Sequence, residues 1–159
     1  MNRQFTPWAV STLVVLLGMH TGCGAGSKDP QFDVVPVRGT VTVNDQPLAD
    51  AQVSYFYQGQ KPEGFPGSGG KTDAQGNYEL STLSQKGTLV GKHKAVVSKM
   101  TMKDGSPPKI QEGIDEEQLK VQGEIVESIP PPYKDPTNTP VTIDVTKDKA
   151  DGYDIKITK

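Results

Sequence analysis

One cysteine and one histidine offer most of the reactive chemistry of this 159-residue chain beyond position 20. They are Cys23 and His93. A zinc site needs three or four protein ligands, and a nucleophile–base–acid triad needs a histidine placed beside a nucleophile. The residues around His93 do not have the spacing of either kind of site. We therefore expect no metal, no cofactor and no catalytic residue, and we predict that His93 lies at the rim of a strand.

Acidic side chains gather at three places. They are Asp73 with Asn77, Glu116 with Glu117, and Asp148 with Asp151 and Asp154. Calcium needs six or more oxygen ligands, and the last group lacks the regular spacing of a calcium loop. Acid–base catalysis needs carboxyl groups in a pocket, whereas the glutamates lie in a polar stretch. We expect Asp73 to hold a tight turn and the other carboxylates to face solvent.

The N-terminal segment predicts export. Arg3 precedes an apolar run of about a dozen residues, from Trp8 to Met19. A membrane span needs ~20 residues, whereas the core of a signal peptide needs ~7–15. We expect residues 1–23 to be a processing segment rather than part of the fold.

A lone cysteine in an exported chain needs an explanation. Thr21-Gly22-Cys23-Gly24 resembles a bacterial lipobox, although His20 stands where lipoboxes usually carry leucine. The resemblance implies cleavage before Cys23 and a lipid, with fatty acids such as palmitate, on its thiol. Residues 24–33 would then be a flexible tether, and the protein would sit in the cell envelope, on the periplasmic or outer face. Secretion after cleavage nearby and an uncleaved anchor are the alternatives.

Size and composition predict one domain with many turns. The chain has 17 glycines, 13 prolines and 33% hydrophobic residues, which favours a thin core of short strands over long helices. The net charge is −2, with acidic and basic residues intermixed. A nucleic-acid-binding face would need clustered Lys and Arg, so we expect no nucleic-acid partner.

Alternating apolar residues predict strands along the chain, beginning with Val37–Val43, where every second residue is apolar or glycine. Asn44–Pro47 favours a turn. The further predicted strands are 52–57, 77–80, 91–100, 141–145 and 153–157. Asp73 and Gly76 are suited to the turn of a hairpin over 71–80.

The remaining segments favour loops. Residues 59–70 are rich in Gly and Pro, and Phe65 is their one large apolar residue. Residues 101–128 are predicted to be a mostly mobile insertion with one or two helical turns near Asp115. Residues 129–140 are predicted to be extended and stiff, because each proline fixes its φ angle. Residues 147–152 are predicted to be a hairpin loop between the last two strands.

Four stretches resemble the carboxypeptidase regulatory-like, transthyretin-like domain of small bacterial lipoproteins. They are Gly39-Thr40-Val41 through Pro47-Leu48-Ala49-Asp50-Ala51-Gln52-Val53, then Thr72-Asp73-Ala74-Gln75-Gly76-Asn77-Tyr78, then Gly91-Lys92-His93-Lys94-Ala95-Val96-Val97, and the tail from Ile129 to Ile155. The resemblance spans residues 34–159 and implies a prealbumin-like β-sandwich of about seven strands in two antiparallel sheets. It implies no activity, because function lies in sites rather than folds.

The expected function is a non-enzymatic, membrane-anchored envelope module with a structural or interaction role. The alternative is a module that binds carbohydrate or peptide, with an envelope protein or polysaccharide as partner. Its candidate ligand contacts are Tyr55, Tyr57, Phe65 and Tyr133. A transthyretin-like hydroxyisourate hydrolase is disfavoured. Its site needs several histidines and a C-terminal Tyr-Arg-Gly-Ser, whereas this chain offers His93 and ends in Thr158-Lys159.

Overall fold

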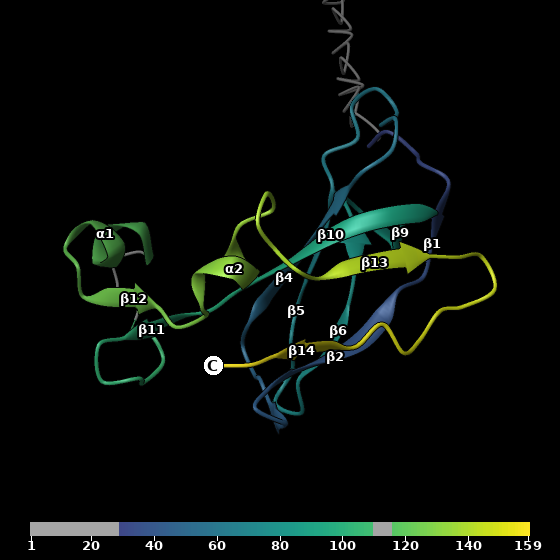
Figure 1. The fold of residues 1–159 in the computed structure, drawn as a ribbon. Helices are drawn as coiled ribbons and strands as arrows, with labels where there is room; N and C mark the ends of the chain where they lie inside the picture. Colours follow the sequence, from purple (N-terminus) through teal and green to yellow (C-terminus); the bar gives the residue numbers. More distant parts are fainter. Residues whose placement is uncertain (1–28, 110–115) are drawn as a thin grey trace, which may run out of the picture.

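The computed structural model describes residues 29–109 and 116–159, and they form a β-sandwich (Figure 1). The first layer is an antiparallel sheet in the order β13-β10-β4-β5-β7-β8. Its strands are Thr142–Val145, Gly91–Ser98, Gln52–Tyr57, Ser68–Lys71, Ser81–Thr82 and Gln85–Lys86. The longest, β10, pairs with β4 over six residues and holds the layer together.

The second layer is built on β2 (Arg38–Val43). Three short strands pair with it: β3 (Gln46–Pro47), β6 (Asn77–Glu79) and β14 (Ile155–Ile157). The first two are antiparallel to β2, and β14 is parallel to it. A further small ladder joins β1 (Val34–Val35) to β9 (Thr88–Leu89).

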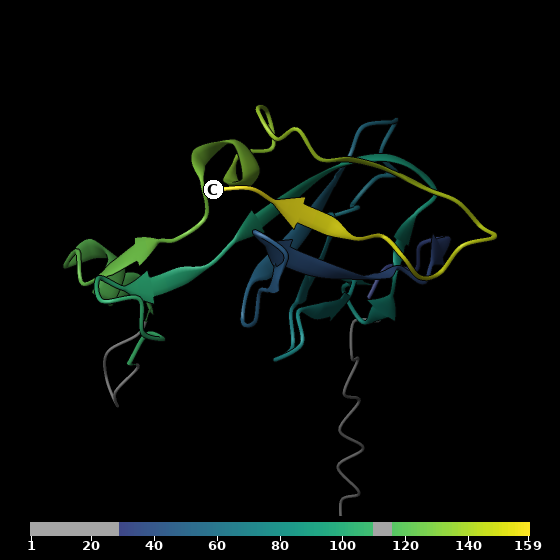
Figure 2. The same cartoon turned by 60° about the horizontal axis from the view of Figure 1, so that its bottom comes forward.

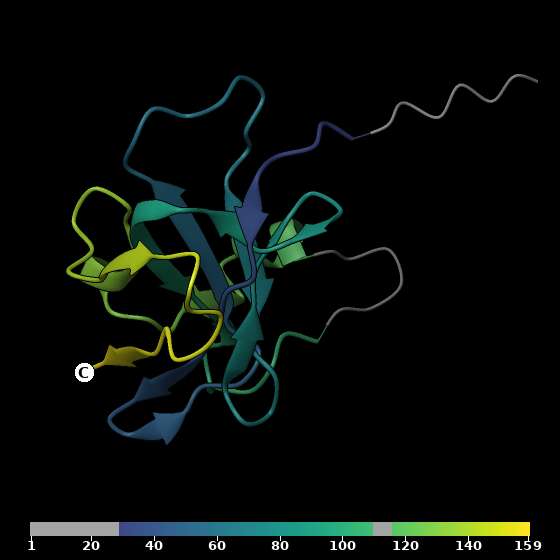
Figure 3. The same cartoon turned by 90° about the vertical axis from the view of Figure 1, so that its right-hand side faces the viewer.

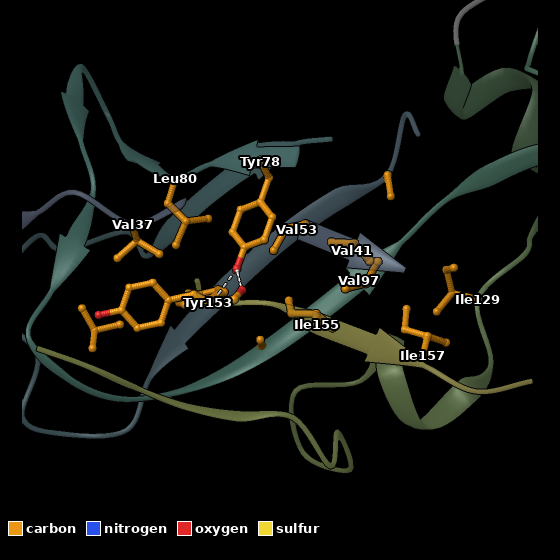
Figure 4. Packing of buried hydrophobic residues seen from close by; sticks show 14 residues of the cluster. Val37, Val41, Val53, Tyr78, Leu80, Val97, Ile129, Tyr153, Ile155 and Ile157 are labelled. Carbon is orange, nitrogen blue, oxygen red and sulfur yellow. Dashed lines mark hydrogen bonds between the residues drawn. The ribbon is translucent and has the colours of Figure 1, made fainter. Parts of the chain in front are cut away.

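The core lies between the layers and draws on both (Figure 4). Its fully buried side chains include Val37, Val41, Val53, Leu80, Val97, Ile155 and Ile157. The predicted alternation in 37–43 is confirmed at Val37 and Val41, which are buried, whereas Gly39 and Val43 are half-buried like Thr40 and Thr42. Each fully buried aliphatic side chain contributes about 1.5–3 kcal/mol relative to its exposed state.

Both predicted turns are present. Asn44 and Asp45 have φ angles of 47° and 63°, which suits the two-residue turn between β2 and β3. The Gly76 amide donates to the Asp73 carbonyl at 3.0 Å, and Gly76 has a φ of 79°. However, the strands on either side of the Asp73 turn do not pair with each other. β5 lies beside β4, and β6 lies beside β2, so this turn passes from one layer to the other.

Two predicted connections are wrong. Residues 147–152 do not close a hairpin, because β13 joins β10 in one layer while β14 joins β2 in the other. Strand alternation cannot distinguish these pairings. Residues 129–140 are not extended throughout, since Pro131–Lys134 forms the short helix α2. Proline is compatible with the first turn of a helix, where its missing N–H is not needed.

An arm extends the first layer beyond β10 (Figure 2). Within its described residues, β11 (Met100–Met102) pairs with β12 (Ile125–Glu127), and the helix α1 (Glu116–Val121) precedes β12. The predicted helical turns are confirmed at 116–121, while Asp115 lies outside the described residues. The prediction of a mostly mobile insertion missed this hairpin, because each strand has only three residues and lies within a largely polar stretch.

Candidate functional site

The four aromatic candidates occupy different environments. Tyr55 is fully buried and Phe65 is buried, whereas Tyr57 and Tyr133 are half-buried. Phe65 packs edge-on against Phe32, with ring centroids 5.2 Å apart. The ring of Tyr57 packs against the ring of His93, with centroids 5.1 Å apart. Tyr57 and Phe65 therefore do not form a shared exposed face in this structure.

Three tyrosines form a chain through the core. The hydroxyl groups of Tyr55 and Tyr78 lie 2.7 Å apart, and Tyr78 donates to the backbone carbonyl of Tyr153 (Figure 4). Since Tyr78 uses its hydrogen on that carbonyl, Tyr55 donates to Tyr78. Burial raises the pKa of both Tyr55 and Tyr78. These hydroxyls therefore stay neutral and connect the layers rather than acting as acids or bases.

The prediction that His93 lies at the rim of a strand is wrong, because its side chain is fully buried. Strand alternation placed it correctly on one side of β10, but it could not show that this side faces the core. Its Nδ1 donates to the carbonyl of Gly91 at 2.9 Å, and its Nε2 lies 3.2 Å from the hydroxyl of Thr88. Burial lowers the pKa of His93. The side chain is therefore a neutral imidazole within the core.

The Thr88 hydroxyl continues into a buried polar network. Ser68 lies 2.6 Å from both Thr88 and Thr82, and Thr82 donates to the carbonyl of Gly87 at 2.9 Å. Ser68, Thr82 and Thr88 are at most 6% exposed. A serine and a histidine in one network could suggest a nucleophile and its base. Here two threonines enclose the serine, and Thr88 separates it from the imidazole, so Ser68 is neither activated by His93 nor open to a substrate.

An open hollow of about 440 Å³ lies beside β2 and β6. Arg38 in its wall pairs with Glu79 at 3.0 Å and with Asp151 at 3.5 Å. Asp154 accepts hydrogen bonds from the amide and the hydroxyl of Thr40, both at 2.9 Å. These carboxylates are engaged in contacts that support the fold.

The pKa shifts around this hollow also argue against acid catalysis. Hydrogen bonds from Lys86 and then Arg38 lower the pKa of Glu79. Hydrogen bonds from Asn77 and Gln75 lower the pKa of Asp73. A general acid needs a raised pKa so that it holds a proton near neutral pH. Both carboxylates are instead held in the charged form.

The base of the arm is fixed by Glu127. Its carboxylate accepts hydrogen bonds from the Ser98 hydroxyl at 2.5 Å and from the amides of Lys99 and Ile129, both at 2.9 Å. Two hollows, of about 720 and 560 Å³, flank this base. Val121 and Val126 on the arm are 80% and 42% exposed. The arm therefore presents apolar side chains to solvent on a support fixed by hydrogen bonds.

Phe56 is an exposed aromatic residue that the sequence did not suggest. It lies on the outer face of β4 and is 38% exposed. Beside it is a hollow of about 280 Å³, lined in part by Ser54, Pro66 and Gly69. The alternation in 52–57 does place Phe56 and Tyr55 on opposite faces of the same strand, but periodicity alone does not show which face is turned to the core.

Cys23, the predicted lipid site, lies outside the described residues. Within residues 29–109 and 116–159, no cluster of three or more His, Cys, Asp or Glu side chains is arranged to hold a metal ion. The helices in those ranges are too short and too polar to cross a bilayer. No family model, curated protein or solved structure matches this chain. The likeness to the transthyretin-like domain stays a prediction.

Proposed function

We propose that this chain is a non-enzymatic envelope module, anchored to a membrane by a lipid on Cys23. The observation that carries the non-enzymatic part is the engagement of the reactive side chains. His93 and Ser68 belong to a closed buried network, and the carboxylates of Asp73 and Glu79 are held by hydrogen bonds. Groups committed to such contacts support the fold and are not free for acid–base work.

The anchor is supported by the sequence around Cys23. An apolar run of signal-peptide length ends just before small residues and the one cysteine of the chain. Acyl chains on its thiol stabilise membrane attachment by ~0.8 kcal/mol per buried CH2 group. The likeness of residues 34–159 to the transthyretin-like domain of bacterial lipoproteins agrees with this anchor. It names no ligand.

The arm is the element that we assign to partner binding. It projects from the sandwich, and Val121 and Val126 expose apolar surface there. The contacts of Glu127 hold its orientation relative to β10. An interaction module needs such a surface on a fixed support, because ordering a mobile segment on binding costs free energy.

Metabolic labelling with a fatty acid tests the anchor. The wild-type protein is expected to incorporate label and to fractionate with membranes. Cys23→Ser is expected to lose both. Thr21→Ser serves as a matched control, since it keeps a small hydroxyl residue two positions earlier. Label retained by Cys23→Ser, or none in the wild-type protein, would refute the anchor.

A second candidate function is carbohydrate or peptide binding, favoured by the exposure of Phe56. An exposed aromatic ring beside a shallow hollow can stack on a sugar. The test is binding of purified protein to a panel of envelope polysaccharides and extended peptides. Phe56→Ala is expected to abolish binding if this face is the site, whereas Tyr57→Phe is expected to retain it. Equal binding by wild-type protein and Phe56→Ala would exclude this face.

A further inference from the structure

The outer face of β4 is open to solvent along most of the strand. Phe56 and Gln52 are exposed and Ser54 between them is half-exposed, whereas Tyr55 and Val53 are buried on the opposite face. Alternate residues of a strand share a face, so the three outer side chains form a row about 13 Å long. Within the described residues, the Ser54 hydroxyl has no hydrogen-bond partner. The row therefore offers solvent an aromatic ring, a hydroxyl and an amide.

A hollow lies at each end of this row. At the Phe56 end, the hollow of about 280 Å³ also touches Pro66. At the Gln52 end, the hollow of about 560 Å³ reaches Pro107 of the arm. Figures 1 and 3 both show the loop 58–67 extending beyond the end of β4 at which Phe56 lies. We call the row and its two hollows the β4 trough.

A glycine keeps the middle of the trough open. Gly69 of β5 stands opposite Ser54 in the register of the sheet. A Cβ atom on Gly69 would lie 3.0 Å from Nε2 of Gln52 and 4.0 Å from Oγ of Ser54. The missing side chain therefore leaves space beside these two polar groups.

The pairing of β4 excludes strand addition as the mode of binding in the trough. An extended peptide that joins a sheet needs a strand with an open edge. β4 pairs with β10 over six residues on one side and with β5 over four residues on the other. Its backbone groups are used within the sheet, so a ligand in the trough is recognised by side chains.

The side chains of the trough suit a sugar chain. A pyranose ring has an apolar face that packs on an aromatic ring such as that of Phe56. Its hydroxyl groups both donate and accept hydrogen bonds, as do the Ser54 hydroxyl and the Gln52 amide. A chain of such rings can use all three side chains of the row in succession.

The charges around the trough balance each other. Lys71 pairs with Asp50 at 3.1 Å near the arm end. Lys94 stands opposite Phe56 in the register, and Glu116 lines the hollow at the arm. Two basic and two acidic side chains leave no excess charge to attract an ionic polymer.

We propose that the β4 trough binds a linear, uncharged polysaccharide that lies along β4 from Phe56 to the arm. The inference deepens the second candidate function and rests on it. It adds the class of ligand and the course of the chain. It also gives the arm a role in carbohydrate binding, through the hollow that Pro107 lines.

Affinity electrophoresis tests the class of ligand. Full-length protein in detergent migrates through gels that contain hydroxyethyl cellulose, glucomannan or alginate. We expect a neutral polymer to retard the protein at low and high salt alike, and alginate to leave it unretarded. Preference for alginate, or retardation that salt abolishes, would overturn the proposal, because salt screens binding that depends on charge.

Oligosaccharides cut from the neutral polymer that binds test the course of the chain. Their affinity, measured by calorimetry, is expected to rise several-fold from the disaccharide to the length that fills the trough, and then to level off. An affinity that does not change with length would show that a single sugar stacks on Phe56, against a trough along the strand.

Two variants test the row itself. Gln52→Ala is expected to weaken binding about fivefold through lost hydrogen bonds. Gln46→Ala, at an exposed strand position of the other layer, is the matched control and is expected to bind like the wild-type protein. Gly69→Thr fills the middle of the trough and is expected to abolish binding, with its fold verified by circular dichroism. If Gly69→Thr does not fold, Gln52→Ala decides, and equal binding by Gln52→Ala and Gln46→Ala would overturn the proposal.

The failure of this inference differs from the failure of the carbohydrate function. If no polymer retards the wild-type protein, both fall together. If a neutral polymer binds the wild-type protein and folded Gly69→Thr equally well, the carbohydrate function stands and the trough is refuted. Binding of extended peptides in place of the polymers would also refute the trough as a sugar site.

Discussion

Gly39 in β2 lies directly against the backbone carbonyl of Tyr153. A Cβ atom on Gly39 would stand 2.2 Å from that oxygen and 3.1 Å from the ring of Tyr78. The carbonyl is also the acceptor for the Tyr78 hydroxyl. Three segments that are distant in sequence therefore meet at a point with no room for a methyl group.

Gly39→Ala is expected to destabilise the protein by about 3 kcal/mol, at the upper end of the usual cost of overpacking, because a backbone carbonyl cannot rotate away. Urea unfolding at neutral pH measures the change. Gly64→Ala is the control. Gly64 has a positive φ but open space around its Cβ position, so its cost is expected to be about 1 kcal/mol. Equal costs at the two positions would contradict the close approach.

Tyr78→Phe is expected to cost about 1–3 kcal/mol, because it leaves the buried hydroxyl of Tyr55 without its acceptor and the Tyr153 carbonyl without its donor. Thermal and urea unfolding report the loss. Tyr57→Phe is a matched control, since Tyr57 is only half-buried, and a change within about 0.5 kcal/mol is expected there. A Tyr78→Phe variant as stable as the wild-type protein would rule out a stabilising chain of tyrosines.

Because His93 is buried, the folded protein is expected to lose stability in mild acid. Burial lowers the pKa of the folded-state imidazole below its ordinary value of about 6.5, although the Gly91 carbonyl and Asp144 oppose the shift. The unfolded state then binds the proton more readily than the folded state. The stability that the neutral imidazole contributes is fully present above pH ~6.5. It is lost as the pH drops toward the folded-state pKa, by up to ~1.4 kcal/mol per pH unit.

Comparing the unfolding free energies of wild-type protein and His93→Gln at several pH values isolates this effect. The difference between the two proteins is expected to shrink from pH 7.5 to pH 5.5, since the variant has no imidazole to protonate. A constant difference would show that another group governs the acid response.

Glu127→Ala is expected to loosen the arm without unfolding the sandwich. The amides of Lys99 and Ile129 lose a charged acceptor, and hydrogen bonds to charged groups are worth about 1.5–3 kcal/mol. Hydrogen exchange at these amides is expected to accelerate by about tenfold or more, since 1.4 kcal/mol is a factor of ten. Glu124→Ala, at an exposed position of the same arm, is the control. Unchanged exchange at Lys99 would exclude the carboxylate as the fixing group.

Local patterns predicted the local structure well. The alternation of Val37, Gly39 and Val41 identified β2, and Asp73 with Gly76 identified the turn. Both features depend on residues within a few positions of each other. The pairing of β14 with β2 depends on how the layers assemble, so the alternation in 153–157 did not reveal it.

The candidate site was harder to predict for the same reason. Tyr55, Phe56 and Tyr57 are three consecutive aromatic residues, and which of them is exposed depends on the layer that β4 joins. The buried position of His93 depends on Thr88 and Ser68, which the sequence did not mark as its partners. The two hydrogen bonds that hold the Phe32 backbone to the sandwich depend on Gln85, a polar residue with no motif around it.

The pairing of β14 with β2 has a consequence for the order of folding. β14 supplies Ile155 and Ile157 to the core and pairs with a strand near the start of the domain. Contacts between such distant residues form late, because a long loop must close first. During synthesis, the core therefore stays incomplete until residues 155–157 have emerged and paired with β2. Under the proposed export, an unclosed core would keep the preceding strands able to pass through a narrow translocation channel.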